Sequence, residues 1–229
     1  MAVGLAGALA RRGLRSVIIA LDEGGDLEPA IRSAGVEYHI LGGRKLRDPR
    51  FHWRLARLLR RIRPDVVHSH NFAALLHTAV ARRVAFVPRM VHTEHAFEYL
   101  ATRPHNYRWI RAAAHRCNAF VTVGEQLISF FRDQVGVLPS HLRVIRNGVD
   151  LTAFQPQTMS AADRRKLGMP DRGFLVGTAG RLAPEKDLGT LIRAVARARA
   201  VRADVSLVLV GEGGEGPALE KLVSDLAVG

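Results

Sequence analysis

Short apolar runs alternate with helical patterns along most of this chain. Residues 14–20 and 36–41 have the length and composition of strands, and the helical pattern at 27–34 between them ends at Gly35. Further strands are expected at 65–70, 87–91, 119–124, 174–176 and 205–210. Strands that alternate with helices are typical of α/β proteins, whose parallel sheets carry helices on both faces. The pattern therefore predicts a doubly wound parallel sheet.

The stretch at 177–194, GTAGRLAPEKDLGTLIRA, joins an expected buried strand to an expected helix. Pro184 stands where a helix can begin, so Arg181 and Lys186 should lie in the connecting loop. Ligands of open α/β sheets bind at this carboxyl edge, where N–H groups at a helix start favour an anion. Two cations beside those groups would favour an anion further, although they could also be solvated side chains of an ordinary loop.

Composition limits the class of protein without choosing a function. A chain of 229 residues with 48% hydrophobic residues can form one large domain or two smaller ones. A single cysteine, Cys117, excludes an intrachain disulfide and fits a reducing compartment. The amino end lacks a basic signal region, and no apolar run is long enough to span a membrane. A net charge of +13 suits phosphorylated ligands, acidic lipids or nucleic acid. From the cysteine usage and the lack of a signal region or a membrane-spanning run, we expect a cytoplasmic protein.

The segment at 51–63 has the pattern of a basic amphipathic helix. Five apolar side chains share one face: Phe51, Leu55, Leu58, Leu59 and Ile62. Five arginines occupy much of the remainder: Arg54, Arg57, Arg60, Arg61 and Arg63. One interpretation is weak contact with an anionic membrane, at the inner face of the cell membrane. The other, which we favour, is a helix that covers the sheet and leaves its basic face in solvent.

Histidines follow two of the expected strands. His68 and His70 would point the same way on a strand, but two histidines are too few for a metal site, and none is expected. His92 ends the next strand and should face the same cleft as His70, although a polar loop histidine bonded to backbone has the same pattern.

Basic and aromatic side chains are interleaved at 96–118. They could clamp single-stranded nucleic acid, bind an anionic acceptor, or belong to one amphipathic helix with Trp109 and Ala112–Ala113 packed inward. The spacing favours a helix from about Asn106, so we regard nucleic acid as the least favoured partner.

Several motifs, in order along the chain, resemble those of the retaining glycosyltransferases of the GT-B fold, family four. They are DVVHSH at 65–70, VHTEH at 91–95, VIRNGVD at 144–150, the GRLAPEKD loop at 180–187 and LVGEG at 209–213. The resemblance implies two Rossmann-like domains, each a doubly wound parallel sheet, that face each other across a cleft. It places an acceptor-side domain at 1–153 and the start of a nucleotide-sugar-binding domain at 154–229.

The resemblance also implies roles for individual residues. Arg181 and Lys186 would bind the diphosphate of a nucleotide-sugar donor, and His92 would contact the donor sugar as the catalytic candidate. The donor would be a substrate, with no cofactor and no metal, and the acceptor a saccharide, a lipid or another small molecule. Further contacts at the cleft or with the acceptor would come from His70, Asn71, Thr93, Arg108, Asn147, Asp150 and Gly211.

The resemblance further leads us to expect a fragment truncated at both ends and inactive by itself. No strand with a Gly-rich turn comes before the first expected helix, and the family's downstream E-x7-E segment is absent. Two alternatives stay open. One is a GT-B-fold nucleotide-sugar epimerase, and the other is a non-catalytic basic protein that binds nucleic acid or an anionic membrane.

Overall fold

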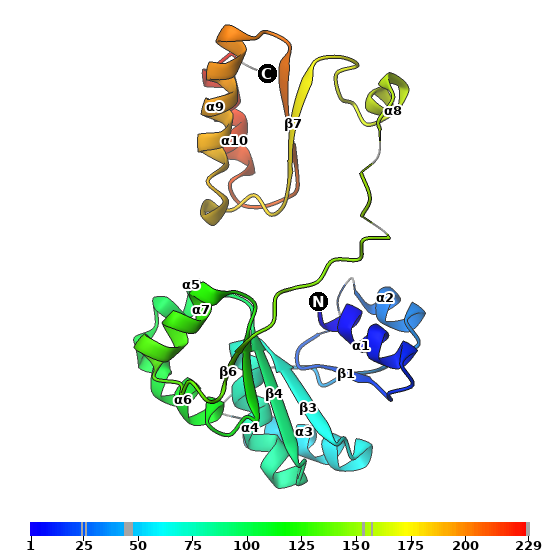
Figure 1. The fold of residues 1–229 in the computed structure, drawn as a ribbon, viewed down its shortest axis with the longest axis vertical. Coiled ribbons are helices and arrows are strands. Elements are labelled where there is room, and N and C mark those ends of the chain that lie inside the picture. The colour runs from blue at the N-terminus through cyan, green and yellow to red at the C-terminus, as the bar shows by residue number, and fades with distance from the viewer. Residues whose placement is uncertain (24, 26, 44–47, 153, 157, 228–229) are drawn as a thin grey trace. The chain divides into compact units, whose positions relative to one another are not determined.

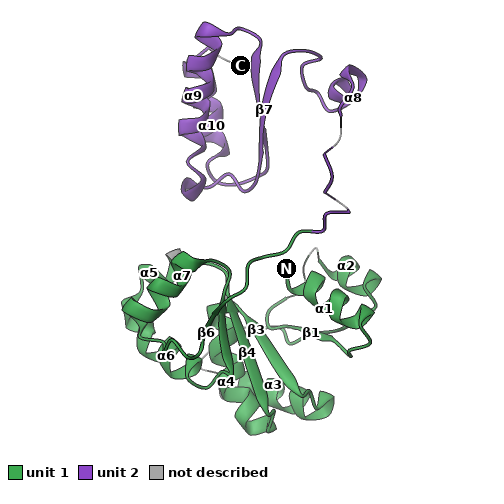
Figure 2. Cartoon of the chain, in the orientation of Figure 1, with its two compact units in different colours: residues 1–149 green, residues 150–229 purple. Residues whose placement is uncertain are grey.

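The computed structural model describes residues 1–23, 25, 27–43, 48–152, 154–156 and 158–227. The chain forms two compact units, residues 1–149 and 150–229, which are described separately (Figure 2). The domain boundary expected after residue 153 falls on a position outside the described residues. Among the helices that the structure describes, none is both long and apolar enough to cross a membrane.

Strands and helices alternate in the first unit as predicted (Figure 1). Its elements are α1 (Ala2–Arg11), β1 (Val17–Ala20), α2 (Glu28–Ser33), β2 (Glu37–Ile40), α3 (Pro49–Ile62), β3 (Val66–His70), α4 (Phe72–Ala85), β4 (Arg89–Glu94), α5 (Glu98–Ala101), a 3-10 turn (Pro104–Asn106), α6 (Tyr107–Ala114), β5 (Ala119–Thr122), α7 (Glu125–Ser129), a π-helical segment (Phe130–Val135) and β6 (Leu142–Val144).

The strands of this unit are parallel, but they form two sheets rather than the single sheet expected. β1 pairs with β2, and a four-stranded sheet has the order β3-β4-β5-β6. Among the described residues β1 and β3 do not pair, so each has one edge without a neighbouring strand. The two sheets still share a hydrophobic cluster, because α3 packs against Ile19 of β1 and Val67 of β3.

One face of the four-stranded sheet is far more buried than the other. Met90, His92 and Glu94 alternate along β4 on the buried face, where side chains from α4 and α6 join the largest core cluster. On the opposite face, Thr93 is buried, Val91 is half-buried and Arg89 is exposed. The largest core cluster therefore lies on one face of this sheet.

Helix α3 is the sheet-covering helix that the sequence favoured. The Asp48 carboxylate accepts a hydrogen bond from the Arg50 N–H at 2.9 Å and caps the first turn. Arg63, in the left-handed conformation, ends the helix before Pro64. The side chains that it buries are Phe51, Leu55, Ala56 and Leu59.

Helix α6 begins where the spacing predicted, but the inward face differs. Ile110, Ala113 and Ala114 are buried, whereas Trp109 is 54% exposed. The expectation that Trp109 packs inward is wrong, because the stripe that starts at Ile110 already fills the core-facing side of this short helix.

The second unit has a two-stranded parallel sheet, and the helices that follow its two strands lie on one side of it (Figure 1). Its elements are α8 (Ala161–Lys166), β7 (Phe174–Ala179), a 3-10 turn (Pro184–Lys186), α9 (Leu188–Val201), β8 (Val205–Val210) and α10 (Gly216–Asp225). Ile192 and Val195 of α9 and Leu219 of α10 are buried. The run at 174–176 was expected to be a buried strand, but Phe174 is 55% exposed, because helices cover only one face here.

Helix α9 also starts later than expected. Pro184 opens a 3-10 turn rather than an α-helix, and Asp187 then takes a left-handed conformation with φ 46°. The α-helix begins only at Leu188. Arg181 and Lys186 thus lie in an extended loop and a tight turn before the helix.

Candidate functional site

The loop that carries Arg181 leaves the sheet at the carboxyl end of β7. The Gly180 N–H donates to the Val210 carbonyl oxygen and the Leu182 N–H to the Glu212 carbonyl oxygen, both at 2.9 Å. These bonds continue the pairing of β7 and β8 beyond the last strand residues. Arg181 therefore lies between two residues that the end of β8 and the loop after it hold in place.

The two predicted cations of this loop are both accessible. The Arg181 side chain is 71% exposed and forms an ion pair with the Glu185 carboxylate, four residues on. A hydrogen bond from the Glu185 backbone N–H, and then the bond from Arg181, lower the pKa of Glu185 below its ordinary value. Lys186 is also exposed, in the turn just before α9. The loop thus offers two cations near a helix start, one of them already paired with a carboxylate.

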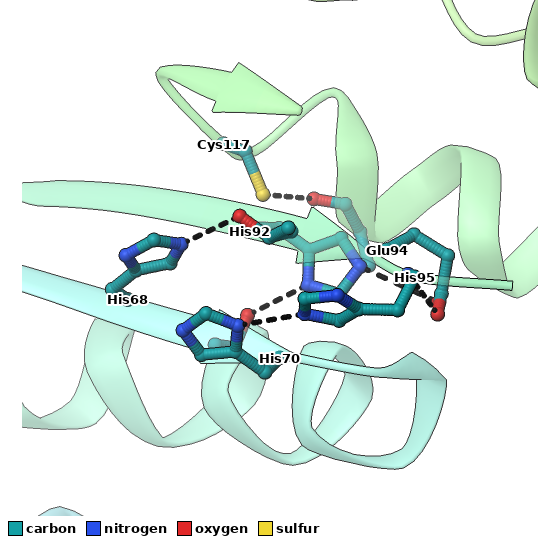
Figure 3. Close-up of polar contacts among 9 residues, drawn as sticks. His68, His70, His92, Glu94, His95 and Cys117 are labelled. Atoms are coloured by element: carbon teal, nitrogen blue, oxygen red, sulfur yellow. Dashed lines mark hydrogen bonds and ion pairs between the residues drawn. The ribbon is translucent and has the colours of Figure 1, made fainter. Parts of the chain in front are cut away.

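Imidazole rings gather at the carboxyl ends of β3 and β4 (Figure 3). His68 Nε2 is hydrogen bonded to Thr93 Oγ1 at 2.8 Å, and His70 Nδ1 to His95 Nε2 at 3.0 Å. The rings of His68 and His70 stack with their centroids 4.3 Å apart. Desolvation, followed by the nearby histidines, lowers the pKa of His70 to about 3 and that of the more exposed His68 to about 4. At neutral pH these rings are uncharged hydrogen-bonding groups.

His92 lies on the opposite face of the sheet from this group. Register pairs His92 with Ser69 and pairs Thr93 with His70, so His92 and His70 point to different sides. The expectation that both histidines face one cleft is therefore wrong. His92 is paired with Ser69, the neighbour of His70, and adjacent residues of a strand point to opposite faces of the sheet. His92 is fully buried against Phe120, with ring centroids 4.8 Å apart.

Two buried polar groups lie next to the His92 ring (Figure 3). Ser69 Oγ is hydrogen bonded to Nδ1 at 2.9 Å, and Glu94 Oε2 lies 3.6 Å from Nε2. The other Glu94 oxygen accepts the His95 backbone N–H at 3.0 Å. At 3.6 Å the Glu94 contact is too long for a hydrogen bond. Nε2 therefore lies near a carboxylate but has no hydrogen-bond partner among the described residues.

The other predicted contacts of the first unit lie in three places. Asn71 is exposed and donates its backbone N–H to the Thr93 carbonyl oxygen at 3.2 Å, which places it beside the histidine group. Arg108 lies on α6, with its guanidinium 4.8 Å from the Trp109 ring centroid. Asn147 is exposed beyond β6, away from these elements in sequence.

Asp150 and Gly211 belong to the second unit. The Asp150 carboxylate accepts the Thr152 backbone N–H at 2.9 Å and the Thr152 hydroxyl at 2.7 Å, so it closes a local turn. Gly211 opens the loop that contacts the Arg181 segment. Within the described part of the chain, no cluster of three or more His, Cys, Asp or Glu side chains has a geometry that could hold a metal ion.

Some residues of these sites were not predicted. Ser69 and Glu94 could not be connected with His92 from sequence, because strand register decides the contact. Glu185 could have been found, since a carboxylate four residues from Arg181 is a common ion-pair spacing.

The fold of the chain is similar to that of solved structures. A crystal structure of the Anabaena protein HepE in complex with UDP and glucose matches with a TM-score of 0.81 at 19% sequence identity, over 99% of this chain and 63% of that one. This likeness places the chain in the GT-B fold class.

A comparison with family models then gives the family. The model of Glycosyltransferase Family 4 matches residues 1–153, and the chain belongs to this family. The UDP-Gal:alpha-D-GlcNAc-diphosphoundecaprenol alpha-1,3-galactosyltransferase of Escherichia coli is 30% identical over 139 residues, which are 58% of this chain and 36% of the relative. The D-inositol 3-phosphate glycosyltransferase of Stackebrandtia nassauensis is 30% identical over 182 residues, which are 71% of this chain and 40% of the relative. The chain thus spans well under half the length of these two curated relatives.

Proposed function

We propose that this chain carries the donor-diphosphate site of a retaining, metal-independent glycosyltransferase. The parent reaction moves a sugar from a nucleotide diphosphate sugar to an acceptor. The observation that carries the proposal is the pair of exposed cations, Arg181 and Lys186, at the carboxyl end of β7 and directly before α9. Family membership and the names of the relatives support the same class of reaction.

The chemistry explains why two fixed cations are needed. When the bond from the sugar to the diphosphate breaks, negative charge develops on the leaving phosphate. Arg181 and Lys186 stabilise that charge electrostatically, together with the N-terminal end of α9, and so lower the barrier without a metal. The Glu185 partner of Arg181 is displaced by the diphosphate, whose charge-assisted bonds to a guanidinium are stronger than a solvated surface ion pair.

We keep His92 as the proposed catalytic contact with the donor sugar. Ser69 fixes the direction of the ring, so the Nε2 edge is the one left for a ligand. Because the ring is buried in the structure, this role requires that the Nε2 edge becomes accessible when the donor binds.

The remaining predicted residues are proposed as contacts for the acceptor or for the rim of its site. His70, Asn71 and Thr93 lie together at the ends of β3 and β4 and offer neutral hydrogen-bonding groups suited to hydroxyls. The further candidates are Arg108, Asn147, Asp150 and Gly211. The Escherichia coli relative is named for a lipid-linked sugar acceptor, and we propose a saccharide or lipid-linked acceptor here too. We place the reaction in the cytoplasm.

An assay with a panel of nucleotide sugars tests this function. The chain, and any longer natural form that contains it, is incubated with each donor, with and without mixed saccharide and lipid acceptors. We expect acceptor-dependent sugar transfer with an unchanged anomeric configuration in the presence of EDTA, and we expect it only in a form approaching the relatives' length. A sugar epimerised on its nucleotide without any acceptor would instead establish the epimerase, and binding without nucleotide specificity would establish a basic binding protein.

A further inference from the structure

The loop after β8 packs against the segment that carries Arg181. Leu182 makes two backbone hydrogen bonds with it, donating to the Glu212 carbonyl oxygen at 2.9 Å and accepting the Glu215 N–H at 3.1 Å. Gly180, on the other side of Arg181, donates to Val210. Both neighbours of Arg181 are thus fixed, Gly180 by the last residue of β8 and Leu182 by the loop at 211–215.

This approach is so close that it excludes side chains at two positions. A Cβ atom built on Gly213 would lie 2.7 Å from the Leu182 carbonyl carbon and 2.9 Å from the Leu182 nitrogen. A Cβ atom on Gly211 would lie 2.9 Å from the Gly180 carbonyl carbon. The obstructing atoms are backbone atoms, so no change of rotamer relieves the overlap. Gly214, one residue further on, has open space around its Cβ position.

We propose that Gly213, assisted by Gly211, is a positioning residue for the donor-diphosphate site. Without side chains, these glycines let the loop after β8 pack on Leu182 and Gly180, and this packing holds the Arg181 backbone at the carboxyl end of β7. The inference rests on the proposed function, in which Arg181 binds the diphosphate. A binding group that is held in place before the ligand arrives costs less ordering entropy on binding.

This role differs from the one that a Gly-rich turn suggests by itself. If the glycines contacted phosphate directly through their N–H groups, an alanine at Gly214 would disturb binding as readily as one at Gly213. If they position Arg181, only the residues packed on the Arg181 segment matter, and their effect depends on the Arg181 side chain.

A titration of four variants tests the proposal. UDP, inorganic pyrophosphate and uridine are added to the ¹⁵N-labelled chain, and the dissociation constants are taken from amide chemical shifts. We expect Gly213→Ala to weaken UDP and pyrophosphate binding about tenfold, as Arg181→Ala does, and Gly214→Ala to stay within about twofold of the wild type. In the double variant Arg181→Ala/Gly213→Ala, the loss should not exceed that of Arg181→Ala alone, because both changes remove the same contact.

The outcomes separate this inference from the proposed function. If Arg181→Ala weakens binding but Gly213→Ala does not, or if the two losses add in full, the positioning role is wrong and the diphosphate site stands. If the wild type binds neither UDP nor pyrophosphate, both proposals fall. Should Gly213→Ala fail to fold, hydrogen exchange in the wild type decides: pyrophosphate should slow exchange at the Leu182 and Glu215 amides, and unchanged exchange would overturn the proposal.

Discussion

Ser69 and His92 form a buried polar pair within an otherwise apolar layer between sheet and helices. Both side chains are at most 3% exposed, and their hydrogen bond is 2.9 Å long. A buried polar group without a hydrogen bond costs free energy, so the hydroxyl that satisfies Nδ1 stabilises the fold as well as fixing the imidazole ring.

Replacing Ser69 by alanine should therefore destabilise the first unit. The change leaves Nδ1 of His92 buried without a partner, which costs about 1–3 kcal/mol of unfolding free energy. Urea denaturation followed by the Trp53 and Trp109 fluorescence measures it. Ser33→Ala, an exposed serine at the end of α2, is the matched control and should change stability by less than about 0.5 kcal/mol. Equal effects of the two changes would contradict the account.

His70 should make the stability of the first unit depend on pH. Its pKa falls from 6.5 in the unfolded chain to about 3 in the fold, through burial and the rings of His68, His95 and His92. Between these values the unfolded chain binds more protons, so the stability from the neutral ring is complete above pH 6.5 and is lost as pH falls toward 3.

Replacing His70 by asparagine should flatten this dependence. The slope that the ring contributes is at most about 1.4 kcal/mol per pH unit, and it is smaller here because the ring is partly solvated. Urea midpoints between pH 7 and pH 4.5 check the prediction, with His105→Asn, an exposed histidine, as the control. An unchanged slope in His70→Asn would show that the ring titrates normally in the fold.

At the scale of elements, local patterns predicted what local forces determine. Helix α3 and strand β8 follow from the apolar spacing at 51–63 and from the short apolar run at 205–210. The division into two sheets did not follow, because pairing joins strands that are distant in sequence. The opposite directions of His70 and His92 were missed for the same reason, since register sets which faces meet.

The arginines of α3 show how packing changes the interpretation of a helix. Arg54 donates to the Leu41 carbonyl oxygen, and Arg60 donates to the Val84 carbonyl oxygen through Nε at 3.1 Å and Nη2 at 2.7 Å. These two side chains bind the protein itself. Arg57 and Arg61, which lie four residues apart, are exposed and are the cations that an anionic membrane would meet.

The less favoured interpretation of this helix, a weak contact with an anionic membrane, therefore depends on Arg57 and Arg61. In co-sedimentation with vesicles containing phosphatidylserine, Arg57→Gln/Arg61→Gln should bind about thirtyfold more weakly than the wild type, since each arginine near an anionic surface contributes about 1 kcal/mol. Arg193→Gln/Arg197→Gln, an exposed pair with the same spacing on α9, removes the same charge and should bind nearly as the wild type does. Equal losses in the two variants, or equal binding to neutral vesicles, would show that α3 is only a sheet-covering helix.

At the scale of the whole molecule, each unit carries residues that the family motifs singled out, and each brings them to the carboxyl ends of parallel strands. Sequence order and the edge rule for parallel sheets were enough to predict this placement. They could not predict that Arg181 is paired with Glu185 or that His92 is buried, because side-chain partners and burial depend on the packed structure.

The net charge of +13 makes a specific test necessary, because a basic protein attracts any anion. A matched control comes from Arg202, which is exposed and paired with Asp204 much as Arg181 is paired with Glu185, but which precedes β8 at the opposite edge of the sheet. Lys221 on α10 is the corresponding control for Lys186.

Calorimetric titration of UDP into the wild type and alanine variants of these four residues tests the donor-diphosphate site. We expect Arg181→Ala and Lys186→Ala each to weaken UDP binding by about 1–3 kcal/mol, because each removes a charge-assisted contact with the diphosphate. We expect Arg202→Ala and Lys221→Ala to leave the affinity within about twofold of the wild type, and uridine without phosphates to bind equally to all five proteins. Unchanged UDP affinity in both Arg181→Ala and Lys186→Ala, or equal losses in the control variants, would contradict the assignment of this loop as the donor-diphosphate site.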